Sequence, residues 1–129
     1  MPIAAQISVM VVDDQRAIRA LVKESLQQLG VRLIFEAQDG EEALMALKRG
    51  PVHLVISDLN MPKLDGLGLL KAVRSTPGLE KTGFIMLTSR GEVELVKQAV
   101  ALGVNNYLTK PFTLGLLKKK IETVFGPLV

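Results

Sequence analysis

Hydrophobic residues along the chain form two alternating patterns that predict its secondary structure. Short continuous apolar runs indicate buried strands, whereas apolar residues three or four positions apart indicate helices with one buried face. The predicted strands are residues 7–12, 31–35, 54–58, 84–88 and 107–109. The predicted helices are residues 15–29, 40–49, 66–74, 92–102 and 114–124. Every strand is thus followed by a helix.

This alternation predicts the fold class. Five strands that alternate with five helices are typical of an α/β protein with a doubly wound, parallel (βα)₅ sheet. Right-handed crossovers would place helices on both faces of that sheet. The pattern shows no linker or second domain, so residues 1–129 are expected to form a single domain of ordinary size. Periodicity alone does not give the strand order.

The predicted helix at 92–102 carries two apolar stripes side by side. A wide buried face explains both stripes. Alternatively, part of this surface is exposed and binds a partner protein, and the pattern does not decide between the two. The stripes are Val93, Val96 and Val100, which we expect in the core, and Leu95, Ala99 and Leu102 beside them.

Composition excludes several kinds of site. There is no cysteine, so disulfides and thiolate metal sites are impossible, and His53 alone gives little basis for a zinc site or a catalytic triad. The net charge is +3, and the one basic run, Lys118 to Lys120, points in several directions on a helix, so nucleic acid is not an expected partner. No membrane span or signal peptide is visible, which predicts a cytoplasmic protein.

Polar residues recur at the carboxyl ends of the predicted strands. Asp13 and Asp14 follow the first strand, and Asp58 ends the third. Thr88 ends the fourth strand and Lys110 follows the fifth. In open α/β sheets, ligands bind outside these strand ends. Taken singly, the acids or the threonine could merely cap the following helices, but together they predict one shared site.

The residue types at this edge indicate phosphoryl chemistry. Three carboxylates placed together repel one another, and a bound divalent cation such as Mg²⁺ relieves that repulsion. A lysine and a hydroxyl facing the same point suit the oxygens of a phosphoryl group. A carboxylate can itself be the nucleophile and form an aspartyl phosphate. The sequence therefore predicts a Mg²⁺-dependent phosphoryl acceptor.

With these motifs the chain resembles the receiver domains of response regulators, and most closely the stand-alone chemotaxis type, CheY. The resemblance covers nearly the whole chain and implies a flavodoxin-like sheet with strand order 2-1-3-4-5. It rests on Val-Val-Asp-Asp at 11–14, Ser-Asp-Leu-Asn-Met-Pro at 57–62, Asp65-Gly66, Thr88, Tyr107 and Lys-Pro-Phe-Thr at 110–113.

The resemblance also implies a role for each residue of the site. Asp58 would accept the phosphoryl group. Asp13, Asp14, Asp58 and the backbone carbonyl of Asn60 would hold Mg²⁺, and Asp65-Gly66 is expected only to start a helix.

Further residues would respond to the phosphoryl group. Lys110 and Thr88 would contact its oxygens, and Tyr107 would turn inward as Thr88 moves. The bond before Pro111 would be cis. Arg90 and Asn60 would flank the path of the hydrolytic water, and because the chemotaxis protein has an acid where Arg90 stands, we expect a different phosphoryl lifetime.

The resulting expectation is a monomeric signalling relay rather than a turnover enzyme. A sensor histidine kinase would donate the phosphoryl group, and the surface formed by the helix at 92–102, the strand at 107–109 and the last helix would bind a separate target protein. Chemotaxis is one pathway, and a phosphorelay or stress pathway is an alternative.

Two functions of other classes remain open at this point. A haloacid-dehalogenase-type phosphatase would also use a strand-end aspartate, although that family wants an acid where Asn60 stands. A phosphorylation-independent module could recognise a nucleotide through Arg16, Arg19 or Arg90.

Overall fold

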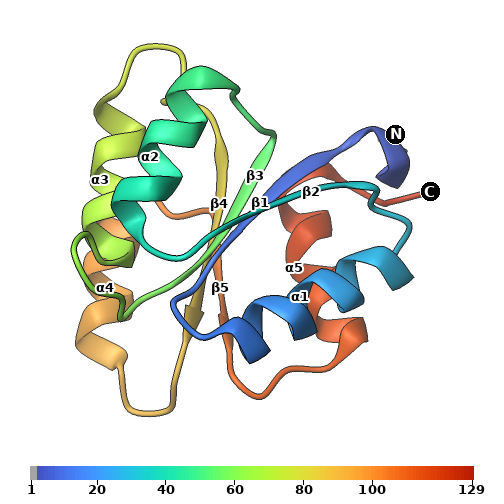
Figure 1. The fold of residues 1–129 in the computed structure, drawn as a ribbon. Coiled ribbons are helices and arrows are strands. Elements are labelled where there is room, and N and C mark those ends of the chain that lie inside the picture. Colours follow the sequence, from blue (N-terminus) through green and yellow to red (C-terminus); the bar gives the residue numbers. More distant parts are fainter. Residues whose placement is uncertain (1–2) are drawn as a thin grey trace.

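The protein folds into one parallel sheet with helices on both faces (Figure 1). The structure is a computed structural model that describes residues 3–129. The strand order is β2-β1-β3-β4-β5, which confirms the expected topology. A 3₁₀ turn at Ala4–Gln6 is followed by β1 (Ser8–Val12), α1 (Arg16–Gln28), β2 (Leu33–Ala37), α2 (Gly40–Arg49), β3 (Leu54–Asp58), α3 (Gly66–Ser75), β4 (Gly83–Thr88), α4 (Val93–Ala101), β5 (Asn106–Thr109) and α5 (Leu114–Phe125).

The sheet separates two hydrophobic cores. Helices α1 and α5 cover one face, and α2, α3 and α4 cover the other (Figure 1). Alternate residues of the central strands point to opposite faces: Val9 and Val11 pack toward α1 and α5, whereas Met10 and Val12 pack toward α2 and α3. Strands β3 and β4 are buried along their whole length, which explains why they read as continuous apolar runs in the sequence.

The second strand begins later than the sequence pattern predicts. Val31 was expected to open it, but the strand runs from Leu33 to Ala37. Gly30 has a φ of 93°, and the Val31 N–H donates to the Leu26 carbonyl, which is the hydrogen bonding of a Schellman helix end. Val31 is buried as the apolar residue that seals this helix end, so its hydrophobicity does not indicate a strand.

The stripe expected in the core of α4 is largely exposed, and that expectation is wrong. Val93 is 59% and Val100 is 61% exposed, whereas Ala99 is buried. Leu95 and Leu102 of the neighbouring stripe pack against the core beside Ala99. Within the described part of α4, Ala99 is the one buried residue. The helix therefore packs on the core through the stripe that contains Ala99, and its outer valines face solvent.

Arg74 ties the end of α3 to two loops on the same side of the sheet. Its guanidinium donates to the carbonyl oxygens of Thr82 at 2.6 Å and Gly103 at 3.1 Å, and to Oδ1 of Asn105 at 3.0 Å. Burial lowers the pKa of this group from its ordinary value. Over residues 3–129, no helix is long and apolar enough to cross a membrane.

Candidate functional site

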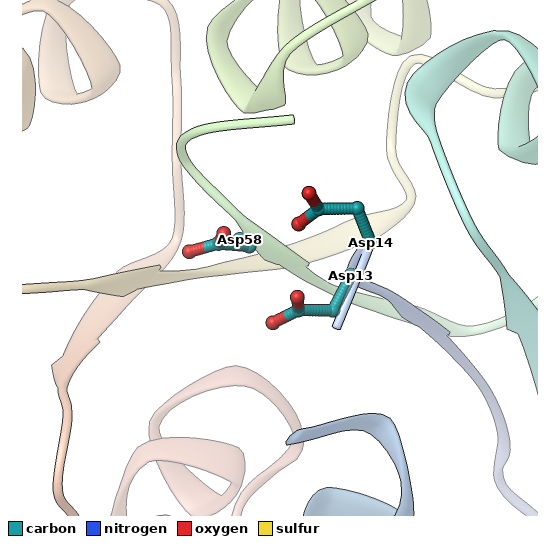
Figure 2. Close-up of side chains that lie close together, drawn as sticks. All are labelled: Asp13, Asp14 and Asp58. Atoms are coloured by element: carbon teal, nitrogen blue, oxygen red, sulfur yellow. The ribbon is translucent and has the colours of Figure 1, made fainter. Parts of the chain in front are cut away.

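The strand-end residues converge because their strands are parallel and aligned. Val12 lies beside Ser57 in the register of β1 and β3, and Asp58 lies beside Leu87 in that of β3 and β4. Asp13 and Asp58 therefore reach the same edge of the sheet. Figure 2 shows Asp13, Asp14 and Asp58 gathered there, and one carboxylate oxygen of each lies within 4.8 Å of the others.

Asp13 is the most buried acid of this cluster. Its side chain is 0% exposed, and its Oδ1 accepts the Gln15 N–H at 2.9 Å. Its Oδ2 is buried and has no hydrogen-bond partner among the described residues. Burial, assisted by the charges of Asp58 and Asp14, raises the pKa of Asp13 to about 6 against the lowering effects of the Gln15 N–H and Lys110. An orphaned, buried carboxylate oxygen fits the ligand of a hard cation.

Asp58 and Lys110 form the charged pair at the centre of the site. Lys110 Nζ lies 3.1 Å from Asp58 Oδ1 and 4.0 Å from Asp13 Oδ2. Burial raises the pKa of Asp58, while the hydrogen bond and charge of Lys110 act in the opposite direction. One cation thus faces two buried carboxylates, so the cluster keeps a net negative charge that suits a divalent cation.

The helix-cap alternative does not describe these residues. Gln15 is the N-cap of α1, and Glu92 is the N-cap of α4, so Asp14 and Thr88 occupy neither position. Asp65 does cap α3, because its carboxylate accepts the Gly68 N–H at 2.8 Å, as expected for a turn and helix start.

Gly66, the residue after Asp65, packs against the backbone of Asp58. A Cβ atom on Gly66 would lie 2.3 Å from the backbone carbonyl oxygen of Asp58 and 2.8 Å from Met86 Sδ. The Gly66 N–H also donates to the Leu59 carbonyl at 2.9 Å. The first residue of α3 therefore lies in close contact with the backbone of Asp58, and only glycine fits at position 66.

Tyr107 lies on the surface and lines a cavity. The residue is 40% exposed, and Lys120 Nζ stands 5.2 Å from its ring centroid. A cavity of about 310 Å³ opens between β5 and the loop before α4, and Thr88, Arg90, Val96 and Tyr107 are among its lining residues. The hydroxyl oxygens of Thr88 and Thr109, two residues that line this cavity, lie 3.4 Å apart.

The Lys110–Pro111 peptide bond is cis, which confirms the expectation for the bond before Pro111.

One charged residue of this region was missed by the sequence reasoning. The carboxylate of Glu92 accepts a hydrogen bond from the Asn60 side-chain amide at 2.7 Å and another from the Ser89 backbone N–H. Asn60 and Glu92 are 32 positions apart, and no motif signals their pairing. Arg90, which was expected to flank the path of the hydrolytic water together with Asn60, is exposed and lines the cavity.

Comparison with known proteins places these features in one family. The pattern described as the response regulator receiver domain matches residues 9–122. A probable chemotaxis protein CheY of Rhizobium etli is 50% identical over 99% of both chains. Chemotaxis protein CheY-3 of Vibrio cholerae is 38% identical over 91% of this chain and 90% of its own.

Solved structures agree with this placement. The chemotaxis response regulator CheY4 of Vibrio cholerae superposes with a TM-score of 0.84 at 35% identity, over 92% of this chain and 98% of its own. The receiver domain of NtrX from Brucella abortus gives a TM-score of 0.84 at 28% identity, over 91% and 97% of the two chains.

Proposed function

The chain belongs to the response regulator receiver domain family, and we propose that Asp58 is the residue on which it accepts a phosphoryl group. It is a receiver of the CheY type, and such receivers take phosphate from histidine kinases and act on downstream targets. The observation that carries the proposal is the position of Asp58, whose carboxylate is held by Lys110 at 3.1 Å beside two further aspartates.

The acidic cluster suits Mg²⁺. Asp13, Asp14, Asp58 and the backbone carbonyl of Asn60 would hold the ion, and the unpartnered Oδ2 of Asp13 is the most direct sign of such a ligand. Bound there, Mg²⁺ would neutralise the carboxylates and the incoming phosphoryl oxygens. Since all the remaining chemistry is positioning and charge neutralisation, the protein needs no other cofactor for this step.

The transfer itself uses groups of the chain. A carboxylate oxygen of Asp58 attacks phosphorus, the P–N bond to the donor histidine breaks, and the histidine nitrogen keeps the bonding pair and takes a proton. The Lys110 ammonium, which donates a hydrogen bond to Asp58 Oδ1 before the transfer, donates to a phosphoryl oxygen afterwards. The Thr88 hydroxyl donates to another oxygen.

The signal would leave through the surface of α4, β5 and α5. Thr88 would move toward the phosphoryl group. The Tyr107 ring, which is exposed in this structure, would then turn into the cavity that both residues line. The exposed Val93 and Val100 belong to the same surface, and apolar residues of this size suit a protein partner. We expect this partner to bind in trans to a monomeric, cytoplasmic receiver.

A phosphorylation experiment tests the proposal. The protein is incubated with Mg²⁺ and a small phosphodonor, and intact-mass spectrometry follows the adduct. Wild type should gain one acid-stable, base-labile phosphoryl group, and Asp58→Asn should gain none. Asp65→Asn, in the same loop region but capping α3, should behave as wild type. An adduct that persists in Asp58→Asn excludes this assignment, and turnover of phosphate esters would favour the phosphatase alternative.

The names of the relatives favour chemotaxis as the pathway. Deletion of the gene should then abolish spreading in soft agar while growth in liquid culture is unchanged. Normal spreading would point instead to a phosphorelay or stress pathway.

A further inference from the structure

Glu92 holds two loops together across the edge of the phosphorylation site. Its Oε2 accepts the side-chain N–H of Asn60 at 2.7 Å, and its Oε1 accepts the backbone N–H of Ser89. Both carboxylate oxygens are therefore engaged, one on the loop after β3 and one on the loop after β4. Bonds of this kind, with a charged acceptor, are stronger than bonds between neutral groups.

The two donors lie on the loops that follow β3 and β4, at the edge of the sheet where Asp58 ends β3. Asn60 is two residues beyond Asp58, and Ser89 follows Thr88 directly. The register partner of Asp58 in β4 is Leu87, so Ser89 extends past the strand end at the same edge. Phosphoryl oxygens take hydrogen bonds from backbone and side-chain N–H groups just as a carboxylate does. The Glu92 carboxylate is thus an anion placed on donors beside an anion-binding site.

We propose that Glu92 is an internal competitor of the phosphoryl group. In the unmodified protein it occupies the Ser89 and Asn60 donors, and it must leave them when Asp58 becomes phosphorylated. This inference rests on the proposed function, and it adds a residue that sets how readily the site accepts and keeps its anion.

Charge supplies the reason for displacement. Phosphorylation adds about −1.5 to −2 charges at the site, and the Glu92 carboxylate would then face a like charge across the same two donors. Glu92 is also the N-cap residue of α4, and its side chain caps no helix N–H, so release of its carboxylate detaches this end of the helix from the loops after β3 and β4. Helix α4 buries Ala99 as its one fully buried residue within the described chain, so few packing contacts oppose the movement.

A simpler interpretation is that Glu92 only fastens the start of α4. The chain offers a matched control for this distinction. Glu94 carries the same charge in the first turn of α4, but its side chain is 81% exposed and it contacts Lys97 at 3.4 Å. Removing either acid changes the net charge equally, and only Glu92 releases the donors.

The test compares Glu92→Ala, Glu92→Gln and Glu94→Ala with wild type. Beryllofluoride with Mg²⁺ serves as the phosphoryl mimic, and its affinity is measured by isothermal titration calorimetry. Glu92→Ala should bind about tenfold more tightly, the equivalent of one charge-assisted hydrogen bond released from competition. Glu92→Gln keeps a single acceptor and should show a smaller gain, whereas Glu94→Ala should match wild type.

A second readout needs neither metal nor anion. In metal-free protein, the amide of Ser89 and the side-chain amide of Asn60 should shift in nitrogen–proton correlation spectra of Glu92→Ala and stay in place in Glu94→Ala. Thermal unfolding of the two variants should agree within a few degrees. A merely structural role would lower the melting temperature without raising the affinity for beryllofluoride.

The outcomes separate this inference from the proposed function. If wild type binds beryllofluoride but Glu92→Ala binds it no more tightly than Glu94→Ala, the competitor role is wrong and phosphoryl acceptance at Asp58 stands. If Glu94→Ala gains as much as Glu92→Ala, net charge explains the effect and the competitor role is again wrong. If wild type neither binds the mimic nor accepts phosphoryl, the proposed function fails and this inference fails with it.

Discussion

Replacing Asp13 by asparagine should stabilise the metal-free protein at neutral pH. The wild-type carboxylate is buried with an unpartnered Oδ2, and its pKa is raised from 3.8 to about 6. Folding therefore favours the protonated form of Asp13. The stability that this form provides is complete below pH 3.8 and is lost as the pH rises through about 6. Asparagine never ionises, so the variant keeps that stability at every pH.

The pKa shift sets the size of the effect. A shift from 3.8 to about 6 corresponds to about 3 kcal/mol at a pH well above 6. The observed gain should be smaller, about 1–2 kcal/mol, because the new amide would stand near Lys110 Nζ, which lies 4.0 Å from Oδ2 in the wild type. The Gln15 N–H keeps its acceptor, since asparagine retains Oδ1.

Urea unfolding in the presence of a chelator measures this difference. At pH 7.5 the midpoint of Asp13→Asn should exceed that of wild type, and at pH 4 the two midpoints should converge. Added Mg²⁺ should raise the midpoint of wild type and leave the variant nearly unchanged, because ligand binding stabilises only the protein that binds it. Glu94→Gln, an exposed acid, should follow wild type throughout. A variant less stable than wild type at pH 7.5 would refute the account of Asp13 as a buried carboxylate whose charge destabilises the metal-free protein.

Three further changes test other parts of the structure. Gly66→Ala should destabilise the protein by about 2–4 kcal/mol in urea unfolding, because its Cβ would meet the Asp58 carbonyl oxygen at 2.3 Å; unchanged stability would mean that α3 can shift freely. Arg74→Ala should cost about 2–4 kcal/mol, since it leaves the carbonyl of Thr82 without its 2.6 Å donor, and Arg74→Lys should recover only part of the loss. Arg90→Glu should change the rate of dephosphorylation, followed by loss of the phosphoryl adduct, and equal rates would remove Arg90 from the path of the hydrolytic water.

The sequence was sufficient to predict the edge of the sheet where the site lies. Parallel strands bring their carboxyl ends together, so Asp13, Asp58 and Lys110 could be placed side by side from their positions after apolar runs. Their contacts, such as the 3.1 Å pair of Lys110 with Asp58, follow from that arrangement. The strand order needed a family resemblance, because periodicity describes each element separately.

Other features depend on contacts that no local pattern encodes. The Asn60–Glu92 hydrogen bond joins two loops and depends on how both side chains turn. The exposure of Val93 could not be predicted because both stripes of α4 have helical spacing, and packing against α3 selects one of them. Val31 misled the strand prediction because an apolar residue that seals a helix end looks like the first residue of a strand.

Few side chains of α4 are buried, so the residues that hold the helix to the protein are separate from those that it exposes to solvent. Ala99 is its single fully buried position within the described chain, whereas Val93 and Val100 stand in solvent. If α4 belongs to the partner surface as proposed, substitutions at the outer positions would change which protein the helix recognises while the fold is preserved. Such a receiver would gain a new protein partner through a few changes on α4, while the residues of the phosphorylation site at the strand ends stay the same.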